Sequence, residues 1–291
     1  MLKELPRRLL RTPLSAAAAA IVLCSLPLVC VLGMALAVSV LLRHGVRSWQ
    51  VQAAMLAGCA IQCGLSGEPT PLLLGGSVLL AACTLRIAGL DKAVLALPFL
   101  GLLAGALLGE WIGTDYLEQL RTVIETLSPK AGSALPSDPN ELLGLLVQGM
   151  GLTTALLTLA VLLLGLHWQD DDEESSELGE SWRALRLPML PAVGLTAAFV
   201  LGSWAEIALL SSPLILLPLL LGGLGLLHWL GHRLKLGGWV FLIYPLVLLV
   251  QPVVGWAISA VGLADAQFDL RAQLVSQSAE EAEEEEDQRW K

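Results

Sequence analysis

The sequence is poor in charge. Of its 291 residues only 15% are Asp, Glu, Lys or Arg and only 5% are aromatic, while 55% are hydrophobic. A soluble domain usually carries about 25% charged and about 45–50% apolar residues. These departures argue against an ordinary soluble domain. We expect an integral membrane protein, with the lipid bilayer as a partner.

The sequence also lacks the motifs of common enzymes. It holds no Walker A loop, no Rossmann glycine motif, no HExxH and no nucleophile elbow with its partner residues. We therefore predict that the chain is not an enzyme and that it has no catalytic residue, no bound metal and no cofactor.

An overall basic character is missing as well. The net charge of −9 comes from acids gathered in two stretches, 170–180 and 265–287. Acidity confined to two exposed segments gives no sign of a nucleic-acid partner, and we expect none.

Cysteine pairs of a disulfide framework are also absent, because all five cysteines lie inside apolar runs. Buried cysteine normally acts as a small hydrophobic side chain, and no His or acid stands beside these. We expect packing roles for Cys24, Cys30, Cys59, Cys63 and Cys83.

What the sequence does contain is long apolar runs. A run of about 18 residues or more can cross the hydrocarbon core. Four tryptophans, Trp49, Trp111, Trp168 and Trp239, stand at the ends of runs, where interfacial anchors are expected. The predicted fold is an all-α transmembrane bundle of about eight or nine segments. The runs are 14–42, 49–66, 69–85, 93–111, 142–168, 189–210, 213–230 and 239–263.

The placement of Lys and Arg orients this bundle. If run 14–42 breaks near Pro27 and crosses twice, twelve bases fall on the side of the N-terminus, and only Arg121 and Lys130 fall on the other side before the tail. A single crossing would move eight of the twelve outside. Because cytoplasmic loops are the basic ones, we predict a multi-pass protein of the bacterial inner membrane with an uncleaved, cytoplasmic N-terminus.

The runs divide the chain into seven parts. In the longest polar stretch, apolar residues recur at helical spacing from Tyr116 to Leu127, which predicts an amphipathic helix on the outer surface. Asp138 and Pro139 are typical of an N-cap and the first residue of the next helix. The parts are a basic N-terminus (1–13), N-terminal membrane helices (14–112), the amphipathic helix and loop (113–141), a membrane helix (142–168), an acidic cytoplasmic loop (169–187), C-terminal membrane helices (188–263) and an acidic disordered tail (264–291).

Both acidic segments are expected to be solvated, because runs of like charge repel one another. Alternatively they recruit a basic partner, which would make the chain a structural or scaffolding protein. The side of the tail stays open. A single crossing by 239–263 puts it outside, whereas a break at Gln251 and Pro252 puts it inside.

Polar and ionisable side chains in apolar runs are costly and are therefore candidates for function. Glu206 and Trp204 lie late in one run, Glu110 and Trp111 end another, and Gln62 lies near the outer end of its helix. Together they could line a cavity that opens to the outside and holds a small ligand. Alternatively, both acids reach the headgroup region and are simply solvated.

Small residues at four-residue spacing predict close contacts between helices. Gly101, Gly105 and Gly109 form such a ridge, and Ala16 and Ala20 form a shorter one.

His228 and His232 also lie four residues apart. No third ligand is visible nearby, so we interpret them, with Arg233 and Lys235, as an interfacial cationic cluster.

Two stretches carry a resemblance to a known family. They are 182–188 (WRALRLP), before a membrane helix, and 262–271 (GLADAQFDLR), leaving the last one. With the many-helix pattern and the long loop before Leu142, the chain resembles the YybS-like family of uncharacterised bacterial membrane proteins. That family is similar to the substrate-binding (S) components of energy-coupling-factor transporters.

The resemblance implies binding or uptake of a small molecule and a second transmembrane protein as partner. It also implies that small residues of the first helix, here Ala16 and Ala20, contact that partner.

Overall fold

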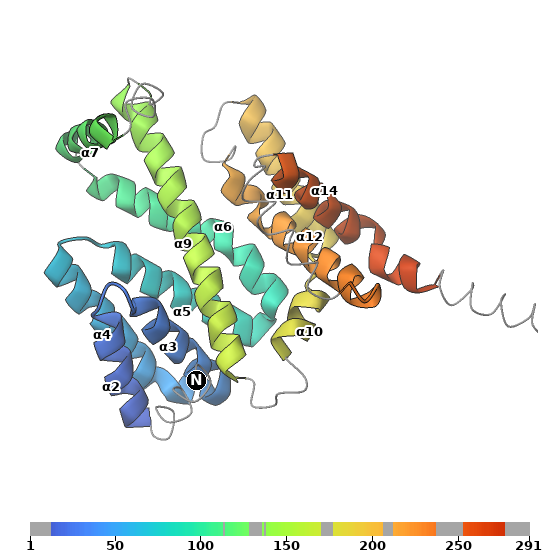
Figure 1. Ribbon diagram of the computed structural model, residues 1–291, viewed down its shortest axis with the longest axis horizontal. Helices are drawn as coiled ribbons and strands as arrows, with labels where there is room; N and C mark the ends of the chain where they lie inside the picture. Colours follow the sequence, from blue (N-terminus) through green and yellow to red (C-terminus); the bar gives the residue numbers. More distant parts are fainter. Residues whose placement is uncertain are drawn as a thin grey trace, which may run out of the picture.

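The computed structural model describes residues 13–112, 114–127, 136, 138–169, 177–205, 212–236 and 253–276. Every regular element in these ranges is helical, so the predicted all-α class is confirmed. The elements are α2 (Pro13–Cys24), α3 (Cys30–His44), η1 (Gly45–Ser48), α4 (Trp49–Ser66), α5 (Thr70–Ala88), α6 (Leu90–Trp111), α7 (Thr114–Leu127), α9 (Pro139–Gln169), α10 (Glu177–Ala184), α11 (Met189–Trp204), α12 (Pro213–Arg233) and α14 (Val253–Phe268) (Figure 1). A short helix, Leu270–Ser276, follows α14 and is called the C-terminal segment below.

Four of the helices, α5, α6, α9 and α12, are long and apolar enough to cross a membrane. Helix α14 and the C-terminal segment make a fifth span if this bent pair counts as one. Helices α2, α3 and α11 are apolar but shorter. The described residues thus support a membrane-spanning protein with four or five long spans, and a count of eight or nine stays a prediction.

The first apolar run is broken into two helices. Helix α2 ends at Cys24 and α3 begins at Cys30, with turns around Pro27 between them. Proline has no N–H group to donate and disfavours the helical conformation of the residue before it, which favours a break here. The two helices pack against each other.

Ala16 and Ala20 lie in the interior of the N-terminal layer, with 1% and 0% of their surfaces exposed. Helix α2 packs closely along α4, where a Cβ on Gly58 would lie 2.7 Å from the carbonyl oxygen of Ile21. The two alanines therefore pack inside this chain. Contact with a partner protein, which the resemblance implies for them, stays a prediction.

Helices α6 and α9 form the centre of the molecule, between α2–α5 on one side and α11, α12 and α14 on the other (Figure 1). The two central helices approach very closely, because a Cβ on Gly101 would lie 2.6 Å from the carbonyl oxygen of Gly151. Gly105 faces the carbonyl of Val147, and Gly109 faces its side chain. The glycine ridge therefore lies in the α6–α9 contact.

The start of α9 matches the predicted cap, because Oδ1 of Asp138 accepts the N–H of Asn140 at 2.9 Å. Helix α7 falls in the stretch predicted to be amphipathic. It buries Leu117 against Ile112 and the start of α9, and it carries an exposed ion pair of 3.0 Å between Arg121 and Glu125.

Basic side chains gather at the other end of α9. Arg43 donates to the carbonyl oxygen of Trp168, near the end of α9, at 2.9 Å. Arg86 donates to that of Leu41, near the end of α3, also at 2.9 Å. Cations are favourable there because the last carbonyls of a helix lack partners and carry partial negative charge. The α7 end and this basic end lie at opposite ends of α9 (Figure 1).

Two predicted polar segments are partly folded. The loop 169–187 contains α10, and the tail predicted to be disordered from residue 264 is helical up to Ser276. The disorder predicted from residue 264 does not hold for 264–276, where Asp265, Asp269 and Arg271 bind other parts of the chain. The acidic runs at 170–176 and 277–291 lie outside the described residues, as does the predicted break at Gln251 and Pro252.

Candidate functional site

The structure does not bring the predicted ligand residues into one described site. Glu206 lies outside the described residues. Gln62 is buried on α4, Glu110 and Trp111 are exposed at the end of α6, and Trp204 at the end of α11 is 85% exposed. Among the described residues, α4, α6 and α11 do not pack along one another.

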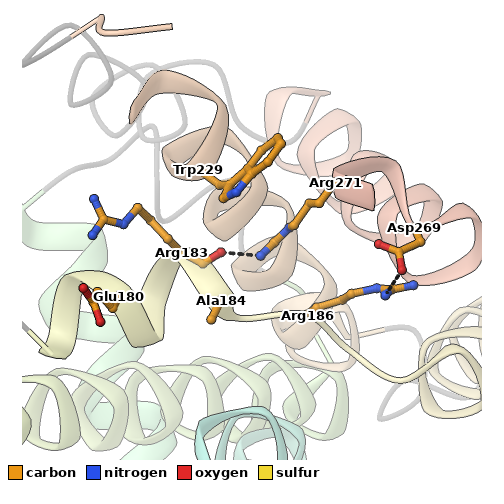
Figure 2. A pocket seen from close by; sticks show the side chains of 7 residues that line it. All are labelled: Glu180, Arg183, Ala184, Arg186, Trp229, Asp269 and Arg271. Carbon is orange, nitrogen blue, oxygen red and sulfur yellow. Dashed lines mark hydrogen bonds and ion pairs between the residues drawn. The ribbon is translucent and has the colours of Figure 1, made fainter. Parts of the chain in front are cut away.

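Instead, the structure joins the two stretches that carry the family resemblance. The end of α10 and the residues that follow it, 185–188, lie against the end of α14 and the C-terminal segment, with α12 behind them (Figure 2). Between them is an open pocket of about 430 Å³, called the arginine pocket below. Its lining residues are Glu180, Arg183, Ala184, Arg186, Trp229, Asp269 and Arg271.

Arg271 binds backbone carbonyl oxygens at the end of α10. Its guanidinium donates to the carbonyl oxygen of Arg183 and, at 2.7 Å, to that of Leu185. Helix α10 ends at Ala184, so its last carbonyls have no partner within the helix. An arginine from a distant part of the chain satisfies that of Arg183 and that of Leu185, the residue after the helix.

Arg186 performs the reciprocal role for α14. Its Nε donates to the carbonyl oxygen of Asp265 at 3.3 Å, and its Nη1 lies 2.6 Å from Oδ2 of Asp269. Each stretch thus contributes one arginine that binds the end of the other's helix. This exchange fixes the two stretches relative to each other.

A buried ion pair lies beneath the pocket. Nε of Arg271 is 3.1 Å from Oδ2 of Asp265, and the two side chains are 12% and 2% exposed. Burial lowers the pKa of Arg271, which lies in the C-terminal segment, while the contact with Asp265 raises it. The guanidinium keeps its charge, because the ordinary pKa of arginine lies far above neutrality.

Asp269 turns the chain at the pocket. It adopts a left-handed conformation (φ 51°), and its Oδ1 accepts the N–H of Ala272 at 3.3 Å. Aspartate tolerates this conformation and is a favoured N-cap residue. The C-terminal segment therefore leaves α14 at an angle of 67°.

Helix α12 forms the wall of the pocket. A Cβ on Gly225 would lie 2.9 Å from the carbonyl oxygen of Trp182, so the missing side chain lets α10 approach. The guanidinium of Arg233 lies over the ring of Trp229, 5.4 Å from its centroid. His228 meets the ring of Trp182 edge-on, with centroids 6.5 Å apart. In the described part of the chain no three His, Cys, Asp or Glu side chains are placed to hold a metal.

One arginine of the pocket is available to an anion. Arg186 and Arg271 are already engaged by Asp269 and Asp265. Among the described residues, the guanidinium of Arg183 forms no hydrogen bond or ion pair, and it points away from Arg271 (Figure 2). A planar fork of N–H donors suits phosphate or carboxylate oxygens.

Sequence reasoning missed this site because it sought polar groups inside apolar runs. The spacing of the charged residues did indicate that these two segments meet. Arg183 and Arg186 lie three residues apart, Asp265 and Asp269 four apart, and Arg271 follows. Opposite charges in two segments that both adjoin membrane helices could have suggested that the segments meet.

Comparison of the chain with family models, with curated proteins and with solved structures gives no match.

Proposed function

We propose that this chain is a multi-pass protein of the bacterial inner membrane, with its N-terminus in the cytoplasm and eight or nine crossings, that binds an anionic ligand in the arginine pocket. The observation that carries the proposal is the unengaged guanidinium of Arg183 beside the half-exposed Arg186 in a pocket of about 430 Å³. Ligand pockets commonly have volumes of about 300–1,000 Å³.

The charge bias along the chain favours the cytoplasmic side for this pocket, because Arg183, Arg186 and Arg233 belong to the basic set. This is the opposite side from the cavity that the sequence suggested. A binding subunit in the manner of S components agrees with the resemblance carried by 182–188 and 262–271, the stretches that form the pocket.

Thermal unfolding of the purified full-length chain in a non-ionic detergent tests the proposal. The probes are pyrophosphate, glycerol 3-phosphate, citrate and dispersed phosphatidylglycerol. A ligand at ten times its Kd stabilises the folded state by about 1.4 kcal/mol. We expect at least one probe to raise Tm in wild type and to have a much smaller effect on Arg183→Gln.

Arg47→Gln is the matched control, because Arg47 is an exposed arginine of the basic end that does not line the pocket. If no probe raises Tm, or if every rise is the same in Arg183→Gln as in wild type, the pocket is not an anion site and the proposal is wrong.

A further inference from the structure

We infer that the anion is the phosphate of a membrane phospholipid headgroup, bound while its acyl chains remain in the bilayer. This inference rests on the proposed function and narrows its ligand to one chemical class, the phosphodiester of an anionic phospholipid. Four observations on the pocket and its rim carry it.

The first observation is the place of the pocket along α12. This helix is of membrane-spanning length, and Trp229 lies in its last turns, with Arg233 at its end. Tryptophan and arginine near the end of a span are typical of the headgroup region. The pocket therefore lies where lipid phosphates are concentrated.

The second observation is the turn at Asp269. The C-terminal segment bends by 67° from α14, as a chain does when it leaves a span and continues along the membrane surface. Its Arg271 is directed into the protein, whereas Leu274 and Val275 are 39% and 51% exposed. Exposed apolar side chains on such a segment suit the boundary between headgroups and acyl chains.

The third observation is the apolar surroundings of the arginines. Phe268, next to Asp269, is 60% exposed, and Leu234, next to Arg233, is 58% exposed. Beside a water-soluble anion these apolar side chains would stay exposed to water, whereas the acyl chains of a lipid would cover them.

The fourth observation is the donor that lines the pocket. The guanidinium of Arg183 forms no hydrogen bond or ion pair among the described residues. Its planar fork of N–H groups suits the oxygens of a diester phosphate such as that of phosphatidylglycerol. Basic pockets between membrane helices on the cytoplasmic side are known to suit lipid headgroups.

The test compares a lipid with its soluble counterpart. The full-length chain in a non-ionic detergent is titrated with phosphatidylglycerol, with phosphatidylcholine of the same acyl chains, and with glycerol 3-phosphate. The midpoint of the rise in Tm is recorded. We expect the phosphatidylglycerol midpoint to be at least tenfold lower than either of the others.

Arg183→Gln is the informative variant, because only its backbone carbonyl takes part in the described contacts and the fold should survive. It should raise the phosphatidylglycerol midpoint at least fivefold, while Arg47→Gln leaves it unchanged. If Arg183→Gln proves unfolded, Arg183→Lys, which keeps the charge and loses the fork, should raise the midpoint to a smaller extent.

The outcomes separate the two proposals. If glycerol 3-phosphate matches or surpasses the lipid with the same dependence on Arg183, the site binds a soluble phosphate: the lipid inference is overturned and the proposed function stands. If phosphatidylcholine is as effective as phosphatidylglycerol, the lipid inference is also wrong. If no titrant depends on Arg183, both proposals fail.

Discussion

The side chain of Arg271 donates a 2.7 Å hydrogen bond to the carbonyl oxygen of Leu185, a residue 86 positions earlier in the chain. This bond links the residues that follow α10 to the C-terminal segment. Each of these two folded parts adjoins an acidic run of the chain. It also holds Arg271 above Asp265, with which it forms the buried ion pair.

Removing Arg271 should therefore be costly. Arg271→Ala leaves the carboxylate of Asp265, 2% exposed, without its counter-charge, and breaking a buried pair in this way costs about 3–5 kcal/mol. Replacing both partners by leucine should cost less than Arg271→Ala alone, because no buried charge then remains. Unfolding of the purified proteins in mixed micelles measures both changes. Equal losses for the single and double variants would show that the ion pair does not matter.

The contact between α6 and α9 should be intolerant of added volume. Gly101→Ala places a methyl group 2.6 Å from the carbonyl oxygen of Gly151, so the helices must separate, at a cost of about 1–3 kcal/mol. Gly76→Ala on α5 is the matched control, because no atom lies within 4 Å of its added Cβ. The control should be neutral or stabilising, since alanine favours the helix by up to about 1 kcal/mol. Equal Tm values for the two variants would contradict the close packing.

Oxidation should link α2 to α4. Cys24 lies against α4 beside Cys59, because a Cβ on Gly58 would lie 2.7 Å from the Cβ of Cys24, and all five cysteines are free. A membrane-permeant oxidant should therefore remove two titratable thiols from the wild type and none from Cys59→Ser. Cys83→Ser should still lose two. Formation of the cross-link in Cys59→Ser would mean that a different thiol, such as that of Cys30, is the partner of Cys24.

The two ends of α9 should face opposite sides of the membrane. Glu118 on α7 and Glu180 on α10 are both exposed, and a cysteine at either position should react readily. An impermeant maleimide applied to intact spheroplasts should label Glu118→Cys, and it should label Glu180→Cys only after the membrane is disrupted. Wild type provides the blank, because none of its cysteines is exposed. Labelling of both variants in intact cells would contradict the orientation.

Much of the architecture follows from local sequence. Pro27 separates α2 from α3, and Asp138 with Pro139 begins α9, because backbone chemistry acts within a few residues. The apolar runs identify helices well, since the absence of charge is a strong signal. The length of a run indicates the length of its helix less well. Helix α11 is shorter than its run, and only part of the last run is described.

The candidate site could not be predicted in the same way. Arg186 and Asp269 are 83 residues apart, and nothing local to either one indicates that they meet. Their pairing depends on the packing of α10 and α14 against α12, which is set by glycines such as Gly225 and Gly262 where backbones touch. In a sequence with 28 glycines, the few that mark helix contacts are not distinguishable by spacing alone.

The central claim is that the stretches 182–188 and 262–271 together form a site for an anionic lipid. Native mass spectrometry of the protein extracted gently from its own membrane tests this most directly. We predict that the wild type and Arg47→Gln retain an adduct with the mass of an anionic phospholipid, and that Arg183→Gln loses it. An adduct of equal abundance in Arg183→Gln, or none in the wild type, would contradict the claim.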